Sequence, residues 1–165
     1  MLRIKAYNKK PVDQILKEGD HLVKIDSITE TCNKDWAQMP WSDRTPQIAI
    51  RYKNAVGYIT HWINLKGYMT IEDYQDAKSA EASGIIFMKH PFSEIEFAVD
   101  LKTNTRIENE DKSRTCMHIL GRIGHCCGIP AGEEINLIDL IGKDLAIRIE
   151  KKSGQLKVTH TFKKV

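Results

Sequence analysis

The stretch PQIAIRYKNAVGYITHWINL, residues 46–65, alternates apolar and polar side chains on both sides of a turn at residues 54–57. Successive side chains of a β-strand point to opposite faces, so this alternation predicts two antiparallel strands joined as a hairpin. One face collects apolar side chains, with His61 among them: Ile48, Ile50, Tyr52, Ile59, Ile63 and Leu65. We expect this face to pack against the protein core.

The opposite face of the hairpin has different chemistry. If the apolar face is buried, the other face exposes two cations and two aromatic rings, which are Arg51, Lys53, Tyr58 and Trp62. Single-stranded nucleic acid requires such a surface, because cations attract phosphates and each ring can stack on a base for ~1–3 kcal/mol. The alternative is an ordinary hairpin whose Tyr58 and Trp62 are covered by another element.

Length and composition favour one folded domain over residues 1–165. The chain is 41% hydrophobic and 28% charged, and 165 residues can bury a core without disulfide bonds. The four cysteines do not have the spacing of a secreted disulfide framework, and the sequence has no apolar run of signal-peptide or membrane-span length. We therefore expect a reduced, cytoplasmic protein.

Basic side chains gather toward both ends of the chain, although the net charge is only +3. Residues 1–10 contain four bases and no acid, and residues 143–165 contain seven bases and two acids. This distribution favours a polyanionic partner.

The rest of the chain adds several strands, two main helical segments and a short helical turn. We predict strands over 1–7, 21–29, 85–89 and 93–101, helical segments over 11–19, 70–84 and 113–130, a loop over 30–46, and a strand pair over 140–162. This order predicts a mainly β protein built on a small, curved sheet. The leading candidate is a five-stranded oligonucleotide-binding (OB) barrel with an inserted helix and extra strands.

Short motifs resemble a phage and prophage family of single-stranded-DNA-binding proteins. The motifs are the helix stop at Gly128-Ile129-Pro130, the Gly-Lys-x-Leu step at residues 142–145, and Gly19-Asp20-His21-Leu22-Val23, which is similar to an opening Gly-x-Tyr-x-Val strand. The resemblance spans residues 19–162. It implies an OB barrel, no cofactor, and a role in DNA replication or recombination in a bacterial host. Two departures are an insertion at about 66–92 and a chain end without an acidic tail.

A metal site and a nuclease site are the competing catalytic interpretations. Five potential zinc ligands lie close in sequence, namely Cys116, His118, His125, Cys126 and Cys127. On a helix, however, Cys116 and His118 point about 200° apart, so we expect no metal. Glu150 begins a Glu-x-Lys sequence downstream of Asp139 and Asp144, as in some Mg²⁺-dependent nucleases, but it runs directly into a turn. We expect no enzymatic activity.

The predicted helix over residues 113–128 also carries a basic stripe, which consists of Arg114, His118, Arg122 and His125. The stripe is either a solvated helix face or an auxiliary contact to phosphates.

The sequence thus predicts non-enzymatic, sequence-tolerant binding of single-stranded DNA, with RNA as an alternative ligand. Arg51, Lys53, Tyr58 and Trp62 would form the binding surface, and Trp36, Trp41 and Arg44 of the long loop would close over the strand. Self-association and contacts with replication or recombination proteins are compatible with this role, and no membrane contact is expected. The alternative is a phage accessory or inhibitor protein that binds a protein through the same face, because exposed Trp, Tyr and Arg are also typical of protein interfaces.

Overall fold

The computed structural model describes residues 2–3, 14–32, 39–90 and 94–165, and the protein is mainly β, as predicted. Its main sheet contains five antiparallel strands in the order β3-β2-β1-β7-β8. Their bounds are β1 Gly19–Cys32, β2 Pro46–Lys53, β3 Tyr58–Asn64, β7 Asp144–Lys152 and β8 Gln155–Phe162. Strands β3 and β8 are the two edges, so the main sheet is open between them rather than a closed barrel.

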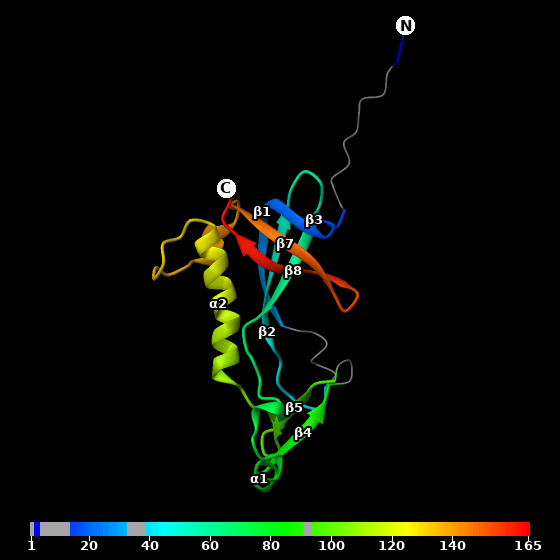
Figure 1. The fold of residues 1–165 in the computed structure, drawn as a ribbon, viewed down its shortest axis with the longest axis vertical. Helices are drawn as coiled ribbons and strands as arrows, with labels where there is room; N and C mark the ends of the chain where they lie inside the picture. The colour runs from blue at the N-terminus through cyan, green and yellow to red at the C-terminus, as the bar shows by residue number, and fades with distance from the viewer. Residues whose placement is uncertain (1, 4–13, 33–38, 91–93) are drawn as a thin grey trace.

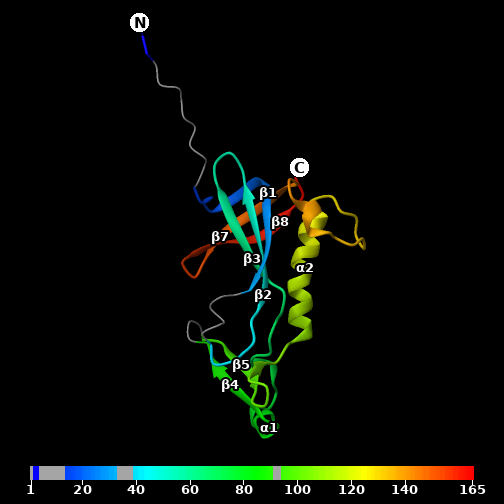
Figure 2. The same ribbon diagram turned by 180° about the vertical axis from the view of Figure 1, so that it is seen from behind.

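A second, smaller antiparallel sheet has the order β4-β5-β6. Its strands are β4 Ile85–Lys89, β5 Glu96–Asp100 and β6 Thr105–Arg106. The two sheets lie at opposite ends of the molecule, and α2 (Glu110–Cys126) runs from the second sheet along the main sheet (Figures 1 and 2). The insertion expected at about 66–92 contains only one of the three strands of this sheet, β4, because β5 and β6 follow it in the chain.

The helix predicted over residues 70–84 is divided into a 3-10 turn, η2 (Ile71–Asp73), and a short helix, α1 (Ala77–Ala82). The Asp73 carboxylate accepts the Thr70 backbone N–H at 2.8 Å, as in a capping box. Asp76 then caps α1 by accepting from the N–H groups of Lys78 and Ser79. A second cap inside one segment explains why the helix starts again instead of continuing.

Other elements follow the sequence with small shifts. The helix predicted over residues 113–130 is α2, which begins three residues earlier because the Asn109 side chain caps it. A 3-10 turn, η3 (Leu137–Leu140), precedes β7. Residues 1 and 4–7 of the predicted first strand and residues 11–13 of the predicted helical turn lie outside the described residues. Residues 2–3 are not in a strand, and 14–18 is not helical. No described helix is long and apolar enough to cross a membrane.

The apolar face of the 46–65 hairpin is the centre of the core, as the alternation predicts. Five of its side chains are almost fully buried: Ile48, Ile50, Tyr52, Ile59 and Ile63. Leu120 and Ile123 of α2 belong to the same core cluster, together with Leu145, Ile147 and Ile149 of β7. The helix therefore covers the inner face of the main sheet, and the outer face of the hairpin is left to other contacts.

A β-bulge in β1 adjusts which side chains face outward. The pairing with β2 shifts between Ile25 and Ser27, so Asp26 is the extra residue. Ile25 on one side of the bulge is buried, and Ile28 on the other side packs against the same core. Asp26 and Ser27 therefore both lie on the outer face, beside β2.

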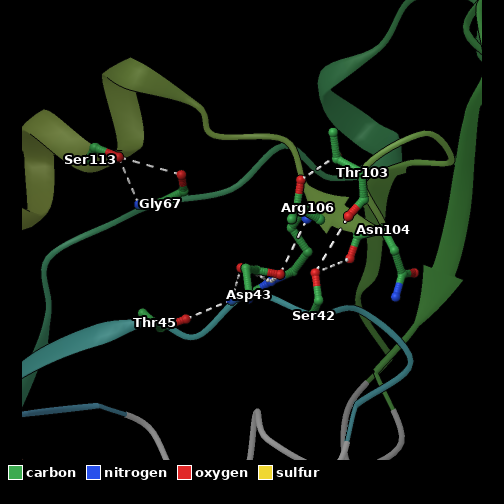
Figure 3. Close-up of polar contacts among 9 residues, drawn as sticks. Ser42, Asp43, Thr45, Gly67, Thr103, Asn104, Arg106 and Ser113 are labelled. Carbon is green, nitrogen blue, oxygen red and sulfur yellow. Dashed lines mark hydrogen bonds and ion pairs between the residues drawn. The ribbon is translucent and has the colours of Figure 1, made fainter.

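Residues 42–45, at the end of the loop between β1 and β2, are held against the second sheet by a buried ion pair (Figure 3). The Arg106 side chain is 0% exposed, and its Nη2 lies 2.8 Å from Asp43 Oδ2 and 2.7 Å from Thr45 Oγ1. Its guanidinium also lies 3.6 Å from the centre of the Tyr68 ring. Ser42 donates its backbone N–H to the Asn104 carbonyl at 2.7 Å.

We expect Asp43→Ala to destabilise the protein by roughly 3–5 kcal/mol, because it leaves a buried guanidinium without its carboxylate. Urea unfolding followed by circular dichroism measures the effect. Glu94→Ala is the matched control, since Glu94 pairs with Lys89 at 3.0 Å in the same part of the molecule but both side chains are exposed. Glu94→Ala should lower the free energy of unfolding by less than ~1 kcal/mol. Equal losses in the two variants would contradict the importance of the buried pair.

Candidate nucleic-acid interface

Four predicted residues lie together on the outer face of β2 and β3, and we call Arg51, Lys53, Tyr58 and Trp62 the platform. Lys53 is the cross-strand partner of Tyr58, and Arg51 is two pairs further along the hairpin, opposite Thr60. The Arg51 guanidinium carbon lies 3.9 Å from the centre of the Tyr58 ring, a cation–π contact. Trp62 is 60% exposed. The predicted division of the hairpin into two faces is thus confirmed, whereas the binding role of the platform stays a prediction.

A shallow groove of about 310 Å³ crosses the outer face beside Trp62. Strands β1, β2 and β3 all contribute to it, through Ser27, Thr29, Thr31, Ala49, Arg51, Thr60 and Trp62. Hydroxyl groups can donate to phosphate oxygens and accept from base amino groups. The groove therefore combines neutral hydrogen-bonding groups with one cation and one exposed aromatic ring.

Asp26, the bulge residue, reduces the positive charge of the platform. Its carboxylate lies 2.8 Å from Lys53 Nζ and 3.7 Å from Arg51 Nε. All three side chains are partly exposed, so water and salt screen these pairs. A phosphate that approaches Lys53 or Arg51 must compete with this carboxylate.

Three loop residues, Trp36, Trp41 and Arg44, are predicted to close over a bound strand, and the structure does not leave all of them exposed for that role. Trp41 is only 2% exposed and packs edge-on against Phe97, with ring centres 5.7 Å apart. The prediction that Trp41 contacts the ligand is therefore wrong: its ring is part of a small core with Met39 and Val99 on the second sheet. Arg44 is exposed two residues before β2 begins, and Trp36 lies outside the described residues.

His61 lies behind the platform, where its Nδ1 is 3.1 Å from the hydroxyl oxygen of Tyr52. Burial lowers the pKa of His61 to about 4, so its imidazole is neutral at pH 7. Burial also raises the pKa of the Tyr52 hydroxyl. His61 therefore belongs to a neutral, partly buried hydrogen-bonded pair behind the platform and adds no charge to the site.

The competing catalytic interpretations gain no support from the described residues. Among them, no three His, Cys, Asp or Glu side chains gather closely enough to hold a metal ion. Asp144 is the first residue of β7, and Glu150 lies six residues further along the same strand. At the usual rise of a strand the two carboxylates are roughly 20 Å apart. Each pairs with lysine: Asp144 with Lys24 at 3.2 Å, and Glu150 with Lys152 at 3.4 Å.

The basic stripe of α2 is exposed on the side of the helix away from its buried residues, which include Leu120 and Ile123. Arg114 of this stripe pairs with Asp111 on the same helix at 3.4 Å. Both interpretations of the stripe stay open.

Sequence reasoning missed two features of this surface. The first is the row of hydroxyls on β1, which the alternation Ser27-Ile28-Thr29-Glu30-Thr31 could have indicated once β1 was paired with β2. The second is Asp26, because a bulge leaves no clear mark in a single sequence.

No known family model matches this chain, and a search of curated proteins found no significant match. The resemblance to phage single-stranded-DNA-binding proteins therefore rests on the short motifs alone and stays a prediction.

The lowered pKa of His61 predicts a loss of stability in mild acid. Between pH 6.5 and about pH 4 the unfolded chain binds a proton at this residue and the folded chain does not. The free energy of unfolding should therefore fall as the pH drops through this window, and the fall should be smaller in His61→Gln. Urea unfolding at pH 7, 5.5 and 4.5 measures it.

Two comparisons make this test specific. His118→Gln removes an exposed histidine and should keep the wild-type dependence on pH. Asp20, Asp73 and Asp144 have pKa values lowered by lysine or arginine partners, so the stability that they supply is lost below about pH 4, outside this window. An unchanged pH dependence in His61→Gln would contradict the assignment.

Proposed function

We propose that this protein binds single-stranded nucleic acid, DNA in the first place, through the platform and without catalysis. The observation that carries the proposal is the exposed Trp62 ring, which stands beside the Arg51–Tyr58 pair above a groove lined by hydroxyls. A large aromatic side chain gains stability when its face is covered. A nucleobase covers such a face by stacking, and every base can do so.

The topology of the main sheet supports this proposal. Strand β1 pairs with β2 on one side and with β7 on the other, and α2 lies in the chain between β3 and β7. An OB fold is a five-stranded, partly open barrel that binds oligonucleotides on its second and third strands. We propose that the main sheet is such a barrel, open between β3 and β8, in which the platform occupies the second and third strands.

The electrostatics favour stacking over charge as the source of affinity. The platform contains two cations, and Asp26 pairs with both. Neutralising one or two phosphates gives a slope of log K against log salt of about −0.7 to −1.4 on single strands. Binding should therefore weaken with salt, but less steeply than for a protein with an extended basic surface.

We expect Trp62→Ala to weaken binding of labelled oligo-dT, 15 nucleotides long, by ~1–3 kcal/mol, or about 5- to 150-fold in Kd, because one stacked base is lost. Fluorescence anisotropy at low salt measures the affinity. The fold should persist, since the ring is largely exposed. Met117→Ala, an exposed apolar residue on α2, is the control and should bind like the wild type. If wild-type protein does not bind the oligonucleotide at low salt, the proposed function is wrong, and a protein partner becomes the better explanation of the platform.

Asp26→Asn should have the opposite effect, because it frees Lys53 and Arg51 for phosphates. We expect tighter binding of the same oligonucleotide and a steeper dependence on salt. Glu94→Gln frees Lys89 on the second sheet and should change neither quantity. Equal affinity and equal salt slope in Asp26→Asn and wild type would mean that phosphates do not contact these two cations.

A further inference from the structure

A second concave surface lies next to the platform, between the edge strands β3 and β8. This β3–β8 cleft has a volume of about 580 Å³. Its polar lining includes Gln47, His61, Asn64, Gln155 and Lys157, and Trp62 is one of its walls. Trp62 and Thr60 also line the groove on the outer face, so the two surfaces share these two side chains.

The lining of the cleft matches the hydrogen-bonding edge of a nucleobase. Gln47 Nε2 donates to Asn64 Oδ1 at 2.6 Å across the β2–β3 pair. This contact leaves the Gln47 amide oxygen free to accept a hydrogen bond and the Asn64 amide nitrogen free to donate one. If both amides are turned over, Gln47 supplies the donor and Asn64 the acceptor, so the combination is the same. Each of the four bases carries a neighbouring donor and acceptor on its pairing edge, so this pair of amides suits any unpaired base.

The charge of the cleft also favours nucleic acid. No side chain that lines it is a carboxylate, and Lys157 forms no ion pair with a described residue. Lys157 is exposed on β8, across the cleft from the two amides. Glu150 is the cross-strand partner of Lys157 on β7, but its carboxylate pairs with Lys152 at 3.4 Å. Lys157 is therefore less neutralised than Lys53, which pairs with Asp26 at 2.8 Å, and attracts a phosphate more strongly.

An extended peptide is the other ligand class that an open sheet edge can accept. Such a peptide would pair with the free backbone groups of β3, which alternate with the groups bonded to β2. The backbone groups of Tyr58, at the start of β3, are already used on this edge, because Tyr58 donates to the Gln14 carbonyl and accepts from the Leu16 N–H. An apolar pocket of about 320 Å³, lined by Ile15, Ile59 and Leu156 among others, lies at the Tyr58 end of this edge, where the backbone groups are already used. The part of the edge that remains free faces the Gln47–Asn64 amides and Lys157, so its lining favours a base and a phosphate.

We propose that the β3–β8 cleft is a second subsite for the single strand, in which a base beyond the one stacked on Trp62 is held by the Gln47–Asn64 amides and its phosphate by Lys157. The subsite rests on the proposed function, because Trp62 is the side chain that joins the two surfaces. It extends that function from stacking alone to hydrogen bonding of a base without preference among the four.

Two 15-nucleotide probes test the subsite: labelled oligo-dT, and an abasic strand of the same length and label that keeps every phosphate. Asn64→Ala should weaken oligo-dT binding by about two- to tenfold, the range for one or two lost hydrogen bonds, and should leave abasic binding unchanged. Lys157→Gln should weaken both probes. Lys151→Gln, an exposed lysine on β7 outside the cleft, is the matched control and should have less effect than Lys157→Gln.

The outcomes separate the subsite from the proposed function. If wild-type protein binds neither probe, the proposed function fails, and the subsite fails with it. If oligo-dT binds and Trp62→Ala weakens it, while Asn64→Ala and Lys157→Gln behave like Lys151→Gln, only the subsite is overturned and the cleft is left for a peptide. If Asn64→Ala weakens both probes equally, the amides do not hold a base, which also overturns the proposal. Circular dichroism of each variant establishes that it is folded.

Discussion

The buried pair between Arg106 and Asp43 is the constraint on which the arrangement of the two sheets depends. A guanidinium that is 0% exposed needs its carboxylate, because an unpaired charge in the interior costs several kcal/mol. Asp43 therefore has to remain against β6, and Thr45, which accepts from the same guanidinium, has to remain with it. Since β2 begins at Pro46, the ion pair fixes where the central hairpin enters the main sheet.

The two sheets consequently differ in what they contribute to the structure. The second sheet holds Trp41 and the end of the β1–β2 loop, whereas the main sheet carries the platform on β2 and β3. Within the main sheet, the bulge at Asp26 keeps Ile25 and Ile28 in the core while it adds a carboxylate to the outer face. The charge of the candidate site is therefore set partly by a packing requirement of β1.

The sequence predicted what depends on local periodicity and missed what depends on distant contacts. The burial of Tyr52 and the exposure of Trp62 follow from alternation within one hairpin, and the turn of the last strand pair follows from Ser153-Gly154, where both residues have positive φ. Arg106 and Asp43 are 63 residues apart, and nothing near either residue indicates the other. Trp41 was misassigned for the same reason: a tryptophan among turn-forming residues is typical of an exposed loop until a sheet from another part of the chain covers it.

The geometry of the platform bears on the kind of nucleic acid that it can accept. Trp62 presents its ring beside a groove, and stacking on that ring requires a base whose face is free. In a duplex both faces of an internal base are already stacked, and freeing one costs a few kcal/mol, which is as much as one ring returns. With its two cations paired to Asp26, the platform has little additional phosphate attraction to offset this cost. The proposed selectivity for single strands therefore rests on the small number of free charges as much as on the exposed ring.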